Sequence, residues 1–237
     1  MKILFAGPSL PDAAALCGDR ITVRPPAAHG DVLAAIREGA TAIGIVDGNF
    51  EHVAPVWHKE ILHALDQGVA VFGAASMGAL RAAECDAFGM IGIGRIYEDY
   101  ANGRRVDDAD VALLHGPAEL GYPALSLPLV NVEATLDRLE ADGSLEKHDI
   151  SSIRTAAREM FYKVRTWPAI LDAAGSFTNR SALLQLFHAR CVDSKREDAL
   201  ALLRALSDFD GKTPAKRGDW TFRATSLWRA VADQPSA

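Results

Sequence analysis

Apolar runs and helix-period segments alternate along the first hundred residues. Four short runs have a β-type composition: residues 2–6, 20–24, 41–47 and 69–74. The first, third and fourth are apolar almost throughout, which is typical of strands covered on both faces. Helical patterns separate them, and those at 31–39 and 55–68 each end on a glycine. This alternation predicts βαβ units and a small doubly wound, mainly parallel α/β fold.

The strand pattern ends near residue 95, and helical patterns dominate the rest of the chain. One of them opens with Ser194 followed three residues later by Glu197, the spacing of a capping box. We therefore expect two parts. Residues 1–125 would form the α/β core, and residues 126–237 a helical C-terminal region packed on it.

Charge and cysteine content narrow the class of protein. The formal net charge is −6 at pH 7, which argues against a general nucleic-acid binder because such proteins carry a basic face. Cys17, Cys85 and Cys191 form no CxxC pair and predict free thiols in a reducing compartment. The sequence has no apolar stretch near the ~20 residues that span a bilayer. We expect a cytoplasmic protein that binds neither nucleic acid nor membrane.

A serine stands where the last predicted strand turns into a helix, in "AASMG" (74–78). In an open parallel sheet, ligands bind outside the carboxyl ends of the strands. The segment resembles the small-x-Ser-x-Gly turn of a nucleophile elbow, with Ala74 in place of the first glycine. The N–H groups of Met77 and Gly78 would then stabilise an oxyanion or bind a carboxylate. The alternative is that Ser76 only caps the helix.

A serine nucleophile needs a base and usually an acid that orients the base. His58 follows the third predicted strand on the same side as Ser76 and is the candidate base. Asp47 or Glu51 would orient it, although carboxylates at strand ends also commonly cap loops. Arg81, in the helix that follows Ser76, either faces the crevice or forms a surface ion pair.

The segment "LLHGPAELGY" (113–122) is punctuated by glycine and proline and is too apolar for a solvated loop. We expect it to fold back near the crevice, where His115 and Glu119 would contribute to binding; packing is the equal alternative. Gly92-x-Gly94 is followed by Tyr97 rather than by the last glycine of a dinucleotide fingerprint. With no P-loop and no metal-ligand spacing, no cofactor or metal is predicted.

An ordered series of segments resembles the TfuA-like family. It runs from "IVDGNFEHVAPVWHKEILHAL" through "GVAVFGAASMGALRAAECDAFGMIGIGRIYEDYANGRRVDDADVALLHGPAELGY" to "LSLPLVNVEATL". The resemblance covers about residues 41–136, with weaker likeness in "ILFAGPSLP" and "AREMFYKVRTW". It implies an accessory protein of YcaO enzymes, which activate a peptide amide oxygen with ATP, in reactions that replace that oxygen by sulfur.

The resemblance also implies a sulfur donor, for which a ubiquitin-like carrier protein ending in a glycine thiocarboxylate fits the predicted site. Releasing sulfide from a thiocarboxylate is acyl chemistry, so one hypothesis is a thiocarboxylate hydrolase that uses Ser76, with His58 and Asp47 as partners. A second is a non-catalytic adaptor that binds the carrier and recruits or stimulates YcaO. An unrelated serine hydrolase or nucleotide-binding α/β protein is the third.

Overall fold

The computed structural model describes residues 1–49, 53–211 and 218–232. The chain divides into two compact units, and the α/β unit comprises Met1–Val106 together with Arg196–Ala237. The helical unit comprises Asp107–Lys195 and is therefore inserted into the α/β unit. The sequence placed a single boundary at residue 125. The structure differs because a C-terminal helix returns to cover the sheet.

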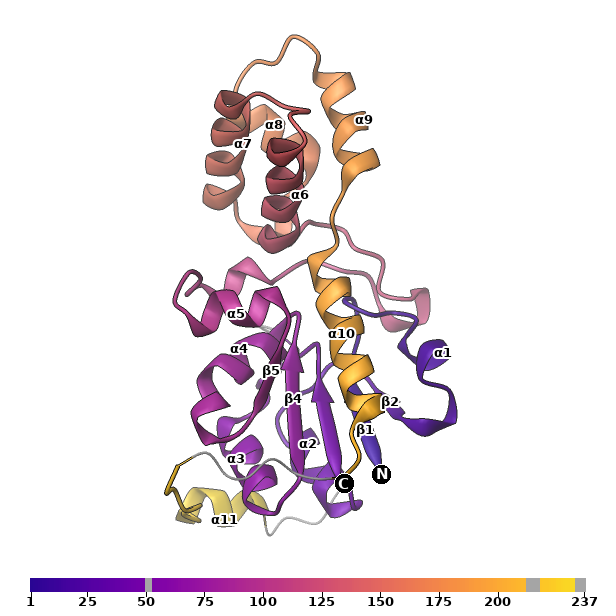
Figure 1. Ribbon diagram of the computed structural model, residues 1–237, viewed down its shortest axis with the longest axis vertical. Coiled ribbons are helices and arrows are strands. Elements are labelled where there is room, and N and C mark those ends of the chain that lie inside the picture. Colours follow the sequence, from indigo (N-terminus) through magenta and orange to yellow (C-terminus); the bar gives the residue numbers. More distant parts are fainter. Residues whose placement is uncertain (50–52, 212–217, 233–237) are drawn as a thin grey trace. The chain divides into compact units, whose positions relative to one another are not determined.

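Five parallel strands form the sheet of the α/β unit, in the order β2-β1-β3-β4-β5 (Figure 1). The strands are β1 (Lys2–Phe5), β2 (Thr22–Arg24), β3 (Ala42–Ile45), β4 (Ala70–Ala74) and β5 (Ile91–Ile93). This confirms the predicted doubly wound α/β fold and adds β5, which the sequence analysis missed. The strand order reverses between β1 and β3, which is where such folds bind ligands.

Three helices cover one face of this sheet, each following one strand and leading to the next: α2 (Asp31–Arg37), α3 (His58–Asp66) and α4 (Met77–Cys85). Their apolar residues pack with the strand side chains that point to this face. Ile43, Ile61 and Val71, for example, are completely buried in one cluster. β3 and β4 are thus buried on both sides, as their continuous apolar sequences predict.

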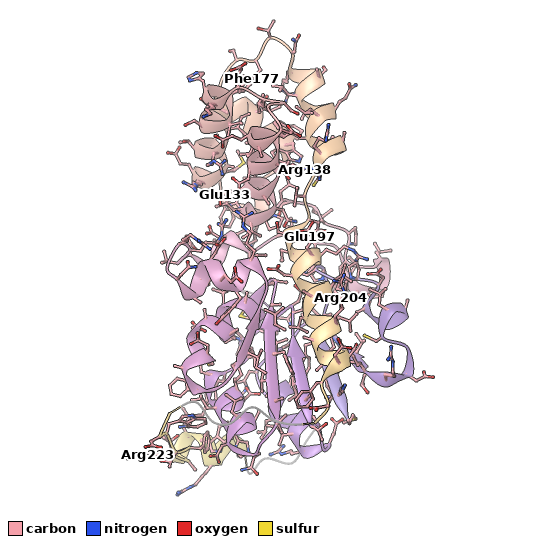
Figure 2. The ribbon with its side chains drawn as sticks, in the orientation of Figure 1. Glu133, Arg138, Phe177, Glu197, Arg204 and Arg223 are labelled. Atoms are coloured by element: carbon pink, nitrogen blue, oxygen red, sulfur yellow. The ribbon has the colours of Figure 1, made fainter. Side chains whose placement is uncertain are left out.

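The other face is covered by α1 (Ala13–Cys17) and by α10 (Ser194–Asp208), drawn in orange in Figure 1. Leu202 and Leu206 reach the sheet so closely that a Cβ on Gly44 of β3 would lie 2.8 and 3.1 Å from their methyl groups. Glu197 and Arg204 are exposed and mark the outer side of this helix (Figure 2). The amphipathic pattern of α10 therefore serves the α/β core.

Short elements complete the α/β unit: the 3₁₀ turns η1 (Gly18–Arg20) and η2 (Asp86–Phe88), α5 (Arg95–Ala101) and α11 (Ser226–Ala232). Asp198 of α10 accepts the N–H groups of Arg95 and Ile96 at 3.1 and 2.8 Å and so caps α5. Among the described residues, no helix has the length and apolar character needed to cross a membrane.

The helical unit contains four main helices and three 3₁₀ turns. The helices are α6 (Leu129–Ala141), α7 (Lys147–Glu159), α8 (Trp167–Ala174) and α9 (Arg180–Arg190), and the turns are η3 (Asp108–Asp110), η4 (Ala118–Leu120) and η5 (Tyr162–Val164). Its separate core includes Trp167 stacked on Phe187, with ring centroids 4.3 Å apart. The buried Arg165 guanidinium donates to the carbonyls of Ala157 and Met160, which ties the end of α7 to the chain that follows.

Candidate functional site

A strained turn leads from β4 into α4 at Ser76. The Ser76 N–H donates to the Ala74 carbonyl at 2.8 Å, which closes a three-residue turn around Ala75. Ala75 is fully buried and has a φ of +66°, a conformation that costs free energy in a residue with a side chain. Strained backbone of this kind is common at functional sites. The turn joins a strand to a helix as the elbow predicted from "AASMG" would, but the positive φ falls on Ala75 and not on Ser76.

Three glycines let the start of α4 lie against the ends of β3 and β4. A Cβ on Gly78 would lie 1.7 Å from the Ile45 carbonyl oxygen, and one on Gly73 would lie 2.1 Å from the Gly78 carbonyl oxygen. A Cβ on Gly48 would lie 2.6 Å from Cγ of Met77. No side chain larger than hydrogen fits at these positions, so the approach of the helix fixes where Ser76 stands.

The Ser76 hydroxyl does not cap α4. Ser76 occupies the N-cap position with φ −123° and ψ −125°, and its side chain makes no capping hydrogen bond. The residue is only 3% exposed. The capping alternative is therefore not what the structure shows.

The two predicted oxyanion donors differ. The Gly78 N–H donates to the Val46 carbonyl at 3.3 Å, so it is already engaged within the protein. Met77 is buried, and no acceptor for its N–H is found among residues 1–49, 53–211 and 218–232. Of the pair expected from the sequence, Gly78 is the one whose N–H has an acceptor within these parts of the chain.

Asp47 lies at the point where the strand order reverses, and its carboxylate accepts three hydrogen bonds there. Oδ2 accepts the N–H groups of Gly7 and Ser9 at 2.8 and 3.0 Å, and Oδ1 accepts the Ser9 hydroxyl at 2.6 Å. Asp47 is 1% exposed. Its contacts join the loop after β1 to the end of β3. The structure pairs Asp47 with Ser9 and not with His58.

His58 belongs to a different cluster, on the outer side of α3 and α4. Its Nε2 lies 2.7 Å from Oε2 of Glu84, and the same oxygen accepts a 2.7 Å hydrogen bond from Nη1 of Arg81. Burial would raise the pKa of Glu84, but the hydrogen bonds from His58 and Arg81 hold it below its usual value. Glu84 follows Ser76 by eight residues, roughly 12 Å along a helix.

Ser76, His58 and Asp47 are therefore not brought together as a hydrogen-bonded triad among the described residues. Arg81 forms the surface ion pair that the sequence analysis gave as one of two alternatives. Glu51 lies outside the described residues, as does the neighbouring His52.

His115 and Glu119 belong to the helical unit, in a hairpin-like segment that runs from Leu114 to Leu125. His115 pairs with Ala124 in an antiparallel bridge, and its ring lies 5.5 Å from that of Tyr122. His115 and Glu119 are both exposed. The segment thus folds back on itself, and neither side chain is buried by packing.

The family model described as "TfuA-like protein" matches residues 47–166, just over half of the chain. The chain belongs to the TfuA-like family. Partnership with YcaO enzymes in thioamide formation is a general property of this family. A comparison with curated proteins finds no match.

Ser9 and Glu60 are two of the buried polar residues that the sequence analysis did not single out. Ser9, 3% exposed, is the partner of Asp47; its position in "GPSLP" after β1 was the available signal. Glu60 is fully buried and accepts the N–H groups of Gly30 and Leu33, which caps α2. Burial raises the pKa of Glu60, and these N–H groups partly offset that rise.

The three cysteines of this TfuA-like protein lie in surroundings that disfavour the thiolate. Burial, aided by the Glu84 charge, raises the pKa of the Cys85 thiol to about 12. Burial also raises the pKa of Cys17 and of Cys191. Because the thiolate is the reactive form of cysteine, this favours chemistry without a cysteine relay.

Proposed function

We propose that this protein is a cytoplasmic accessory protein that supplies sulfur to a YcaO enzyme during peptide backbone thioamidation. The sulfur comes from a ubiquitin-like carrier protein whose terminal glycine is a thiocarboxylate. The observation that supports this most directly is the turn at Ser76. It places a buried hydroxyl with no capping role at the carboxyl edge of the sheet, next to a strained Ala75.

The proposed reaction is hydrolysis of the thiocarboxylate. The Ser76 oxygen attacks the acyl carbon, the C–S bond breaks, and hydrosulfide leaves with the serine proton. Water then hydrolyses the resulting ester, which returns the carrier as a carboxylate and restores the hydroxyl. The Met77 N–H is the candidate donor for the tetrahedral oxyanion. Asp47 positions the neighbouring loop through Ser9.

A second function is favoured by the positions of the other candidates. His58 is engaged by Glu84, and Asp47 by Ser9, so neither is bonded to Ser76. This arrangement supports an adaptor that binds the carrier terminus at the Ser76 turn and presents it to YcaO without breaking the C–S bond. Binding residues then affect affinity, whereas catalytic residues affect turnover.

The two functions are separated by measuring sulfide release from a glycine-thiocarboxylate carrier in the absence of YcaO. The carrier mass is followed at the same time, because replacing sulfur by oxygen lowers it. For the hydrolase, wild type releases sulfide and Ser76→Ala loses at least about a hundredfold in rate while still binding the carrier. Ser151→Ala, which alters an exposed serine of α7, is the control. The adaptor is supported if wild type and Ser76→Ala both bind the carrier and neither releases sulfide.

A further inference from the structure

The α/β unit contains a cavity of about 360 Å³ away from the Ser76 turn, between the first turns of α3 and the C-terminal segment. It is lined by Trp57, His58, Lys59, Leu62, Thr225, Leu227 and Trp228. The volume lies within the range of small-molecule sites, roughly 300–1,000 Å³. Most of the lining is aromatic or aliphatic, which suits an apolar ligand.

Aromatic contacts hold the C-terminal wall of this cavity in place. The His63 ring lies 5.1 Å from that of Phe222 and 5.0 Å from that of Trp228, and these two rings are 5.2 Å apart. Trp228 is 4% exposed. A wall anchored in this way is formed before any ligand binds, so a ligand need not order it.

Lys59 is the positively charged lining residue of the cavity. Lys59 and His58 are its ionisable lining residues, and none of the described lining residues is acidic. Nζ of Lys59 lies 4.8 Å from the centre of the Phe222 ring, which keeps the ammonium group beside the aromatic wall. His58 already contacts the Glu84 carboxylate, so it adds little charge for a ligand.

We propose that this cavity binds a small monocarboxylic acid with an aromatic or branched apolar body. The body packs against Trp57, Leu62 and Trp228, and the carboxylate pairs with Lys59. One ammonium group matches one negative charge, and Glu84 beside His58 disfavours a polyphosphate. The site goes beyond the proposed sulfur delivery and does not depend on it.

The test is calorimetric titration of the full chain with phenylacetate and with phenylacetamide, its neutral isostere. Wild type binds phenylacetate, and phenylacetamide binds at least about tenfold more weakly because it lacks the charge-assisted contact. Lys59→Gln lowers phenylacetate affinity about tenfold and removes the difference between the ligands, whereas Lys59→Arg retains it.

Leu227→Asp serves as a second variant, since this side chain is 62% exposed and a polar replacement there should leave the fold intact. It places a negative charge on the wall and lowers phenylacetate affinity about tenfold. Leu16→Asp, on α1 and 44% exposed, is the matched control and leaves binding unchanged. Any of three results would overturn the proposal. Wild type could bind the two ligands with equal affinity, or fail to bind millimolar phenylacetate. Alternatively, Leu227→Asp and Leu16→Asp could lose equal amounts of phenylacetate affinity.

Discussion

Replacing Asp47 should destabilise the α/β unit at the carboxyl ends of β1 and β3. Asp47→Ala removes the acceptor of the Gly7 and Ser9 N–H groups and of the Ser9 hydroxyl, at 2.8, 3.0 and 2.6 Å. The hydroxyl can rotate, but the two buried N–H groups cannot move to water. Each unsatisfied donor costs about 1–3 kcal/mol, so the free energy of unfolding should fall by about 2–6 kcal/mol. Asp47→Asn keeps one acceptor oxygen and should cost about 1–3 kcal/mol.

The measurement is urea unfolding followed by far-UV circular dichroism and tryptophan fluorescence. Asp12→Asn is the matched control, because Asp12 forms an exposed ion pair with Arg196, worth about 1 kcal/mol or less. A double-mutant cycle with Ser9→Ala should give a coupling energy of about 1 kcal/mol or more.

A contrary outcome is easy to recognise. If Asp47→Asn unfolds like wild type and shows no coupling to Ser9, the carboxylate does not hold the two loops together. If sulfide release then also falls in that variant, Asp47 acts on the reaction and not on the scaffold.

Three further changes test other parts of the structure. Ser76→Ala should lower the free energy of unfolding by less than about 0.5 kcal/mol, because its hydroxyl caps no helix. Thr166→Ala removes a side chain that does cap α8 and should lower it by about 1 kcal/mol. Equal losses in a urea titration would show that Ser76 acts as a cap. Gly78→Ala should cost about 3 kcal/mol or more, because its Cβ would lie 1.7 Å from the Ile45 carbonyl oxygen; a wild-type Tm would contradict the close approach. Burial raises the pKa of Asp198 to about 6 from an ordinary 3.8, so the folded protein binds more protons than the unfolded chain between these values. Unfolding free energy should therefore rise as the pH falls from 6 to 4, relative to Asp198→Asn, and parallel pH profiles for the two proteins would argue against this.

The sequence pattern predicted the longer strands because their burial on both faces requires unbroken apolar runs. It missed β5, which has three residues and a central glycine. Gly92 and Gly94 were considered as part of a nucleotide fingerprint. In the structure a Cβ on Gly92 would lie 2.2 Å from the Tyr97 ring, and one on Gly94 2.2 Å from Cγ of Asp198. These glycines serve packing, and only the fold reveals it.

The candidate site was predicted only in part, for a physical reason. The turn at Ser76 is local, so the switch from apolar run to "SMG" was enough to find it. The partners of His58 and Asp47 are set by contacts between elements far apart in sequence. Arg81 and Glu84 are both on α4, and Ser9 follows β1, 38 residues before Asp47. The sequence alone does not indicate which of many polar residues will contact His58 or Asp47.

The return of α10 to the sheet has a consequence for synthesis of the chain. The ribosome completes β5 at Ile93, but α10 ends only at Asp208, about 115 residues later. At roughly 5–20 residues per second, the apolar face that receives Leu202 and Leu206 stays without this cover for roughly 6–23 seconds. The whole helical unit is made in that interval. The newly made sheet therefore exposes this apolar face until α10 emerges.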